Sequence, residues 1–102
     1  MKKADAELVC IAQFTAKEGK EEELIRLMHR LIAPTHRETG CLRYELNQQQ
    51  DNPRVITFVE KWASREVFDA HCQMAYIKDY FQNVAPNLVE MQSVTLHREI
   101  LP

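Results

Sequence analysis

Apolar residues recur along this chain with two spacings, one typical of strands and one typical of helices. Continuous or alternating apolar runs predict strands, over residues 8–14, 41–46, 55–62 and about 91–100. Apolar stripes repeating every three or four residues predict helical segments, over residues 21–32 and from 65 to about 84. The order β-α-β-β-α-β predicts a ferredoxin-like α+β fold, in which a four-stranded antiparallel sheet carries both helical segments on one face.

Four residues mark where the helical segments are expected to begin and end. Pro34 lacks a backbone donor and should kink or interrupt the first segment, and Gly40 is the expected C-terminal cap. Ser64 is placed to cap the start of the second segment. That segment, or a short continuation of it, is expected to stop at Pro86.

The strand over residues 55–62 predicts a sheet with two apolar faces, which one copy of the chain cannot cover on both sides. Its two faces are Ile56, Phe58, Glu60 and Trp62 on one side, and Val55, Thr57, Val59 and Lys61 on the other. Helices can cover only one face of the sheet. The other face stays apolar, and a monomer rarely leaves such a surface in water. We therefore expect a homodimer in which two open sheet faces pack together as a dimeric α+β barrel.

Composition limits the class of protein. A chain of 102 residues, 45% apolar and 27% charged, is expected to form one globular domain over residues 1–102. The net charge is −2 and basic residues are scattered, which argues against nucleic acid as a partner. There is no apolar run of membrane-spanning length and no signal-peptide pattern, so no membrane partner is expected. Three widely spaced cysteines are typical of a reducing compartment, and we expect a cytoplasmic protein.

No cofactor is predicted. The chain has no glycine-rich phosphate loop and no dinucleotide fingerprint, so nothing in it supports nucleotide or flavin binding. His29 and His36 are seven residues apart with Pro34 between them, and no carboxylate stands at ligand spacing. A metal site is therefore not expected.

Three groups of residues resemble one family. They are Glu38-x-Gly40-Cys41-x-x-Tyr44, Phe58-x-Glu60-x-Trp62, and Ala70-His71 nine residues beyond the tryptophan. Together they resemble the antibiotic biosynthesis monooxygenase (ABM) domain, over about residues 8–100. The resemblance implies a dimeric α+β barrel with a pocket between helices and sheet. Members include cofactor-free oxygenases of quinols and polyketide anthrones, haem-degrading proteins and an isomerase of a phosphorylated signalling sugar.

Two positions depart from the family pattern. Many members have a second histidine five residues after the first, where this chain has Tyr76. The haem-degrading branch uses an asparagine on its first strand, where this chain has Ala12. The second departure argues against haem degradation.

The leading functional hypothesis is oxygenation of a small aromatic, quinol-like substrate without metal or flavin. His71 is the proposed base, because its unperturbed pKa lies near neutral pH and it falls on an inward helical stripe. Glu60 is proposed to orient His71 or to act as a second base. The proposed pocket wall is aromatic: Trp62, Tyr44, Tyr76, Phe81 and Phe58, with Tyr80 as a further candidate. Each of these residues could instead be part of an ordinary core.

Two alternatives stay open. Isomerisation of a phosphorylated sugar or hydroxyketone would need cationic groups in the pocket, for which Arg37 and Arg43 are the nearest candidates. A non-catalytic dimeric module, binding a ligand or associated with stress, would have only a core in place of the pocket. A cavity too small for an aromatic ring would favour this second alternative.

Overall fold

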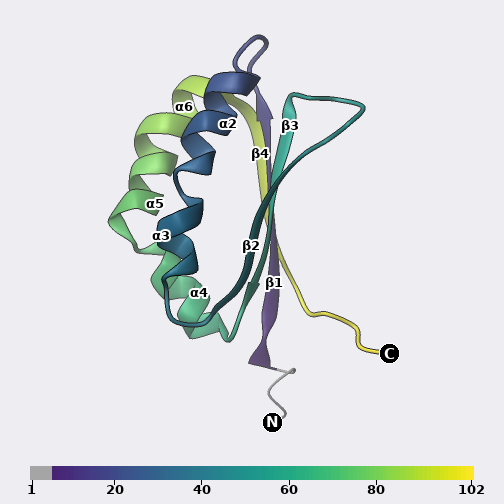
Figure 1. Ribbon diagram of the computed structural model, residues 1–102, viewed down its shortest axis with the longest axis vertical. Coiled ribbons are helices and arrows are strands. Elements are labelled where there is room, and N and C mark those ends of the chain that lie inside the picture. The colour runs from purple at the N-terminus through teal and green to yellow at the C-terminus, as the bar shows by residue number, and fades with distance from the viewer. Residues whose placement is uncertain (1–5) are drawn as a thin grey trace.

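The computed structural model describes residues 6–102 and has the predicted fold. Four strands form one antiparallel sheet in the order β2-β3-β1-β4, and the helices all lie against one face of it (Figure 1). The strands are β1 (Leu8–Ala16), β2 (Cys41–Gln48), β3 (Val55–Trp62) and β4 (Val89–His97). The helical elements are α2 (Glu21–His29), α3 (Ile32–His36), α4 (Arg65–Cys72), α5 (Ala75–Asp79), the π-helix η1 (Tyr80–Val84) and α6 (Ala85–Leu88).

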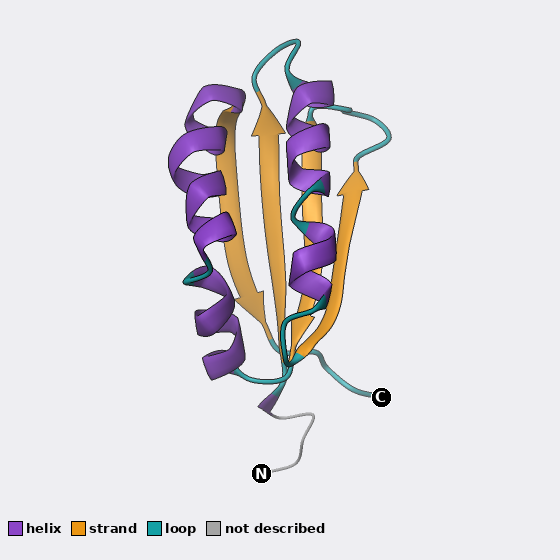
Figure 2. Cartoon of the chain, turned by 60° about the vertical axis from the view of Figure 1, so that its left-hand side comes forward, coloured by secondary structure: helices purple, strands orange, loops and turns teal. Residues whose placement is uncertain are grey.

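The helices form two rows over the sheet (Figure 2). One row is α2 followed by α3, and α3 contacts β2. The other row runs from α4 to α6, with α4 contacting β3 and α6 contacting β4. The core lies between the rows and the sheet, and its side chains include Phe14, Leu24, Met28 and Ile56. No helix among the described residues is long and apolar enough to cross a membrane.

Proline acts one turn earlier than its own position in the first row. The break between α2 and α3 falls at Arg30 and Leu31, and Pro34 lies inside α3. The proline ring crowds the carbonyl four residues before it, which belongs to Arg30. The predicted interruption is therefore present, but it lies on the N-terminal side of Pro34.

The prediction that Pro86 ends the second helical row is wrong. The row continues through η1 and α6 as far as Leu88. Pro86 lies in the first turn of α6, where its missing N–H removes no required hydrogen bond. By contrast, Ser64 caps α4 as predicted, with its Oγ accepting a hydrogen bond from the backbone N–H of Val67 at 3.2 Å.

Gly40 is needed for a reason other than the predicted helix cap. It lies beyond the end of α3, with a φ of +84° that favours glycine. A Cβ atom at this position would lie 2.7 Å from a methyl group of Val67 on α4. The glycine thus allows α4 to approach the segment that joins α3 to β2.

The sheet face away from the helices is left open in a single chain (Figure 1). Its central strands present Val9, Ile11, Val55 and Val59, all of which are only half-buried. Met91 on the edge strand β4 is exposed on the same face. The predicted surface for a second copy is therefore present.

Candidate functional site

Strand register places a row of polar side chains on the covered face of the sheet. Cys10 of β1 is paired with Glu60 of β3, and Glu60 is paired with Tyr44 of β2. All three side chains are buried, with Glu60 only 4% exposed. The row therefore brings a carboxyl, a phenol and a thiol under the helices.

His71 lies above this row, on the inward stripe of α4. The residue is 4% exposed, and its ring centroid is 4.4 Å from that of Trp62. Trp62 itself is 0% exposed, and its Nε1–H donates a hydrogen bond of 2.9 Å to Oε1 of Glu60. The indole thus contacts both the imidazole of His71 and the carboxyl of Glu60.

The hydrogen-bond partner of His71 is Glu38, which lies between α3 and β2. Nδ1 of His71 is 3.0 Å from Oε2 of Glu38, and both side chains are largely buried. A carboxylate can only accept hydrogen bonds, so Nδ1 must carry the proton. The other ring nitrogen, Nε2, makes no hydrogen bond with any described residue. In the neutral imidazole it is therefore a lone-pair acceptor.

Tyr76 and Thr35 complete this network. The Tyr76 hydroxyl donates to the same Oε2 of Glu38, and it lies 3.3 Å from the Oγ1 of Thr35. Burial and the hydrogen bond to Glu38 raise the pKa of Tyr76 to about 12, so the phenol stays a neutral donor. Two donors from α4 and α5 thus hold the Glu38 carboxylate in place.

The two buried titratable groups are shifted toward their neutral forms. Burial lowers the pKa of His71, and the hydrogen bond and charge of Glu38 oppose that effect only in part. Burial raises the pKa of Glu60 to about 7, against hydrogen bonds from Trp62 and Cys10 that favour the carboxylate. Near neutral pH the site therefore combines a neutral imidazole with a carboxyl that can be present in either form.

A cavity of about 50 Å³ lies between the helical rows and the sheet. Its exposed wall residues are Phe81, which is 37% exposed, and Val94 on β4, so it opens between η1 and β4. Its wall is mostly apolar and consists of Cys10, Ala12, Phe14, Leu31, Tyr44, Phe58, Glu60, Phe68, His71, Cys72, Ile77, Tyr80, Phe81 and Val94.

Five of the seven predicted site residues line this cavity, and two do not. The five are His71, Glu60, Tyr44, Phe58 and Phe81. Trp62 lies behind His71, and Tyr76 lies on the far side of the imidazole, at Glu38.

The carboxylate that hydrogen-bonds to His71 is Glu38 and not the predicted Glu60. Glu60, proposed to orient the imidazole, instead accepts from Trp62, because alternation along β3 places these two side chains on one face. Glu38 takes the orienting position. It stands in the sequence segment Glu38-x-Gly40-Cys41, but strand and helix periodicity give no reason to choose it, because it lies between elements.

The residues considered for other chemistry lie away from the cavity. Arg43 is paired with Glu45 at an exposed position, and Arg37 is exposed. No lysine or arginine is among the residues that line the cavity. His36 hydrogen-bonds to the carbonyl of Tyr44 at 3.0 Å. Within residues 6–102 no three His, Cys, Asp or Glu side chains gather as metal ligands would.

Comparison with known proteins gives consistent matches. The family model described as antibiotic biosynthesis monooxygenase, ABM, matches residues 8–83. Protein SO0527 of Shewanella oneidensis is 45% identical in sequence, with a TM-score of 0.94 over 96% of this chain and 95% of its own. A structure named antibiotic biosynthesis monooxygenase is 26% identical, with a TM-score of 0.82 over 93% of this chain and 99% of its own. The provisionally named monooxygenase Rv0793 of Mycobacterium tuberculosis is 29% identical over 84% of each chain.

Proposed function

Because this chain belongs to the antibiotic biosynthesis monooxygenase family, we propose that it oxygenates a small aromatic, quinol-like molecule without metal or flavin, using His71 as the base. The observation that carries this proposal is the bond between Nδ1 of His71 and Glu38 at the wall of an apolar cavity. It leaves Nε2 as the proton acceptor on a largely buried imidazole.

The first step is proton transfer from a substrate hydroxyl to Nε2 of His71. The imidazolium that forms is stabilised by the Glu38 carboxylate at 3.0 Å. His71 therefore combines two useful properties. Its lowered pKa keeps it unprotonated before the reaction, and its charged partner lowers the cost of charging it during the reaction.

The later steps need dioxygen and the proton held on His71. The anion passes one electron to dioxygen, and the resulting radical and superoxide combine at a ring carbon to form a peroxide anion. The His71 imidazolium returns its proton to this anion, which gives a hydroperoxide and restores the neutral base. Loss of water then converts a CH₂ carbon of the keto form into a carbonyl group, so that one oxygen atom enters the product and the other leaves as water. The ring carbon supplies all four electrons that dioxygen accepts, so no external reductant is required.

The cavity must open to admit a ring. A cavity that holds benzene is about 150 Å³, three times the volume of about 50 Å³ found here. Phe81 is the side chain best placed to move, because it is partly exposed at the mouth and its aromatic contacts, with Phe14 and Tyr80, are tilted or edge-on. Displacing it would widen the mouth of the cavity between η1 and β4.

We also propose a cytoplasmic homodimer built through the open sheet face. The half-buried valines and isoleucine of β1 and β3 support this, together with the exposed Met91. A second sheet packed about 10 Å away would remove this surface from water. Three free cysteines fit a reducing compartment such as the cytoplasm.

Oxygen uptake with a panel of hydroquinones tests the catalytic proposal. His71→Ala should abolish enzyme-dependent uptake, whereas His29→Ala, which removes an exposed histidine of α2, should not. Glu38→Gln keeps the shape and removes the charge. A hydrogen bond to a charged group contributes about 1.5–3 kcal/mol, so we expect uptake to slow by about 10- to 150-fold.

Two further results would separate an orienting role of Glu38 from a structural one. Removing the charge lowers the pKa of His71 further, so the acid limb of the pH–rate profile should shift to lower pH in Glu38→Gln. If Glu38 acts through His71, the double variant His71→Ala, Glu38→Gln should show the same oxygen uptake as His71→Ala alone. Full activity of His71→Ala, or no uptake with any hydroquinone, would refute the proposal.

A further inference from the structure

The hydroxyl of Tyr80 has no hydrogen-bond partner among residues 6–102. Tyr80 is the first residue of η1 and is 2% exposed, and its oxygen makes no hydrogen bond with any described residue. An unpaired buried hydroxyl destabilises a fold, and native proteins contain few of them. Phenylalanine would fill the same space without that cost.

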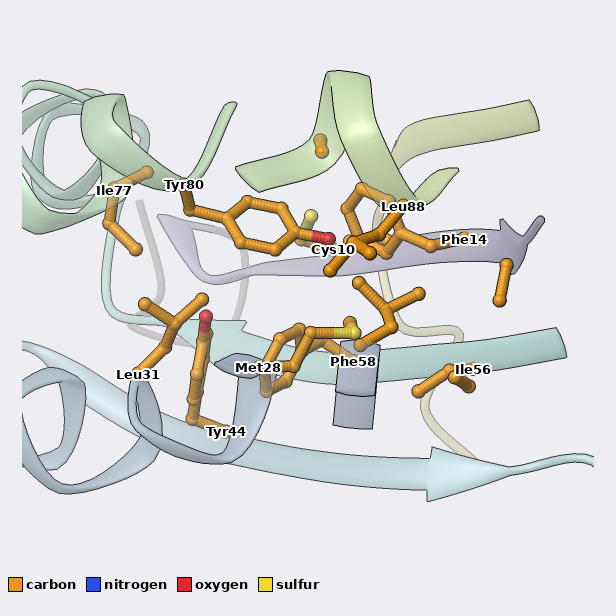
Figure 3. Close-up of a cluster of buried hydrophobic side chains, with 14 of the residues drawn as sticks. Cys10, Phe14, Met28, Leu31, Tyr44, Ile56, Phe58, Ile77, Tyr80 and Leu88 are labelled. Atoms are coloured by element: carbon orange, nitrogen blue, oxygen red, sulfur yellow. The ribbon is translucent and has the colours of Figure 1, made fainter. Parts of the chain in front are cut away.

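The Tyr80 ring points into the cavity from the helical side. Figure 3 shows the ring extending from its helix over β1, with the hydroxyl at its inner end. The ring makes edge contacts with Phe14 and Phe81, with centroid distances of 5.4 Å and 5.1 Å. The contact with Phe14 does not depend on Phe81, so it can hold the Tyr80 ring when Phe81 moves. The element η1 is also the kind of π-helical turn that often occurs at functional sites.

The hydroxyl shares an otherwise mainly apolar cavity with Glu60 and His71. Each of these two has a partner within the protein, Trp62 for Glu60 and Glu38 for His71. Among the three, only Tyr80 has a side chain that makes no hydrogen bond at all with a described residue. A ligand oxygen that enters the cavity would meet a donor that gives up no existing bond.

We propose that Tyr80 is a binding residue that donates a hydrogen bond to the oxygen of a phenol- or quinol-type ligand in this cavity. The proposal rests on the proposed function and adds the residue that recognises oxygen. The bond strengthens when the ligand becomes an anion, because hydrogen bonds to charged acceptors are about twice as strong as neutral ones. Tyr80 therefore favours the same proton transfer that His71 performs.

Phenol and toluene test this proposal without turnover. They have nearly the same shape, and only phenol has an oxygen. Calorimetric titration of the full chain under anaerobic conditions should show that phenol binds more tightly than toluene. In Tyr80→Phe the affinity for phenol should fall about two- to tenfold, the range expected for one neutral hydrogen bond. The affinity for toluene should not fall.

Tyr76→Phe is the matched comparison for stability, because it removes a tyrosine hydroxyl that does make a hydrogen bond, to Glu38. Tyr76→Phe should therefore lower the Tm. Tyr80→Phe should lose the preference for phenol and leave the Tm unchanged or higher.

Several results would overturn the proposal. These are equal binding of phenol and toluene by the unaltered chain, a preference that survives in Tyr80→Phe, or no binding of either compound. A Tm that falls as far in Tyr80→Phe as in Tyr76→Phe would show instead that the Tyr80 hydroxyl has a structural partner, such as an ordered water. None of these measurements uses dioxygen, so failure here is distinct from failure of the oxygenation assay.

Discussion

Gly40 is expected to keep His71 and Glu38, the proposed catalytic pair, in contact, and replacing Gly40 with alanine tests this directly. Two effects add at this position. The φ of +84° places an alanine in the left-handed region, which costs an L-residue about 1–2 kcal/mol. The new Cβ would also lie 2.7 Å and 2.9 Å from the two methyl groups of Val67. Overpacking of this kind costs about 1–3 kcal/mol.

Gly19 provides a matched control for the backbone effect. It has a φ of +79°, and a Cβ there would have no atom within 4 Å. Gly19→Ala should therefore show the backbone cost alone. Gly40→Ala should lower the free energy of unfolding by about 1–3 kcal/mol more than Gly19→Ala does, which corresponds to a Tm lower by at least about 4 °C. Protein concentration must be equal in all samples, since association would also shift the Tm.

The clash also has a consequence for His71, because Val67 and His71 share α4. Relief requires the closer Val67 methyl to move from 2.7 Å to the 3.4 Å at which ordinary contact begins. A shift of this size along the line from Glu38 to His71 would break their 3.0 Å hydrogen bond. The Nδ1 proton of His71, observed by NMR, should lose its hydrogen-bonded shift in Gly40→Ala and keep it in Gly19→Ala.

Adding Val67→Ala to Gly40→Ala removes the clash and leaves the backbone cost. The double variant should recover the His71 signal. Its loss of stability relative to Val67→Ala alone should equal that of Gly19→Ala relative to the unaltered chain. If Gly40→Ala and Gly19→Ala were equally destabilised, or if Val67→Ala gave no recovery, close approach would not be the reason for the glycine.

Two more predictions concern the buried carboxyl and the open face. The pKa of Glu60 is raised from 4.5 to about 7, so the folded protein retains a proton that the unfolded chain releases between these values. The free energy of unfolding therefore falls as pH rises through this window. Glu60→Gln should be more stable than the unaltered chain at pH 8 by up to about 3 kcal/mol, and nearly equal to it in stability at pH 4.5. Thermal melts that show the same gain in stability at both pH values would contradict this. On the open face, Val59→Lys places a charge in the proposed dimer interface. In sedimentation analysis this variant should have a mass near 12.0 kDa, whereas the unaltered chain and the surface variant Gln82→Lys should have twice that mass. A dimeric Val59→Lys would place the interface elsewhere.

The fold could be predicted because its elements depend on local spacing. Alternation along residues 55–62 matches β3 at both ends, and Ser64 caps the helix expected to follow it. The second helical row was harder to delimit. A proline ends a helix only where its missing backbone N–H would have to donate a hydrogen bond. The π-helical turn η1 ends just before α6 begins, so Pro86 lies in a first turn, where that N–H is not needed. Spacing alone does not reveal such a turn.

The site could be predicted only in part, for a related reason. His71 and Glu60 stand out because a polar residue interrupts an apolar stripe. Glu38 interrupts no apolar stripe, because it lies between α3 and β2. Its contact with His71 also spans 33 residues of sequence. That contact depends on how closely α4 approaches the α3–β2 segment, which Gly40 sets. Long-range placement of this kind has no periodic signal.

The polar groups around the cavity also help to distinguish an active site from a plain core. Glu60 and His71 are each held toward the neutral form by burial, and Tyr80 has an unpaired hydroxyl. Each of these features costs stability, and an apolar side chain of similar size would avoid the cost. Buried titratable or unpaired polar groups of this kind are expected at functional sites, where they serve binding or catalysis although they lower stability. The volume of about 50 Å³ is too small for an aromatic ring and taken alone favours the non-catalytic alternative. The three polar groups around the cavity favour a binding site instead, because a purely structural cavity gains stability from apolar lining groups. We therefore propose that the cavity widens at Phe81 when a ligand binds, and a ligand-bound structure in which Phe81 has not moved would contradict this.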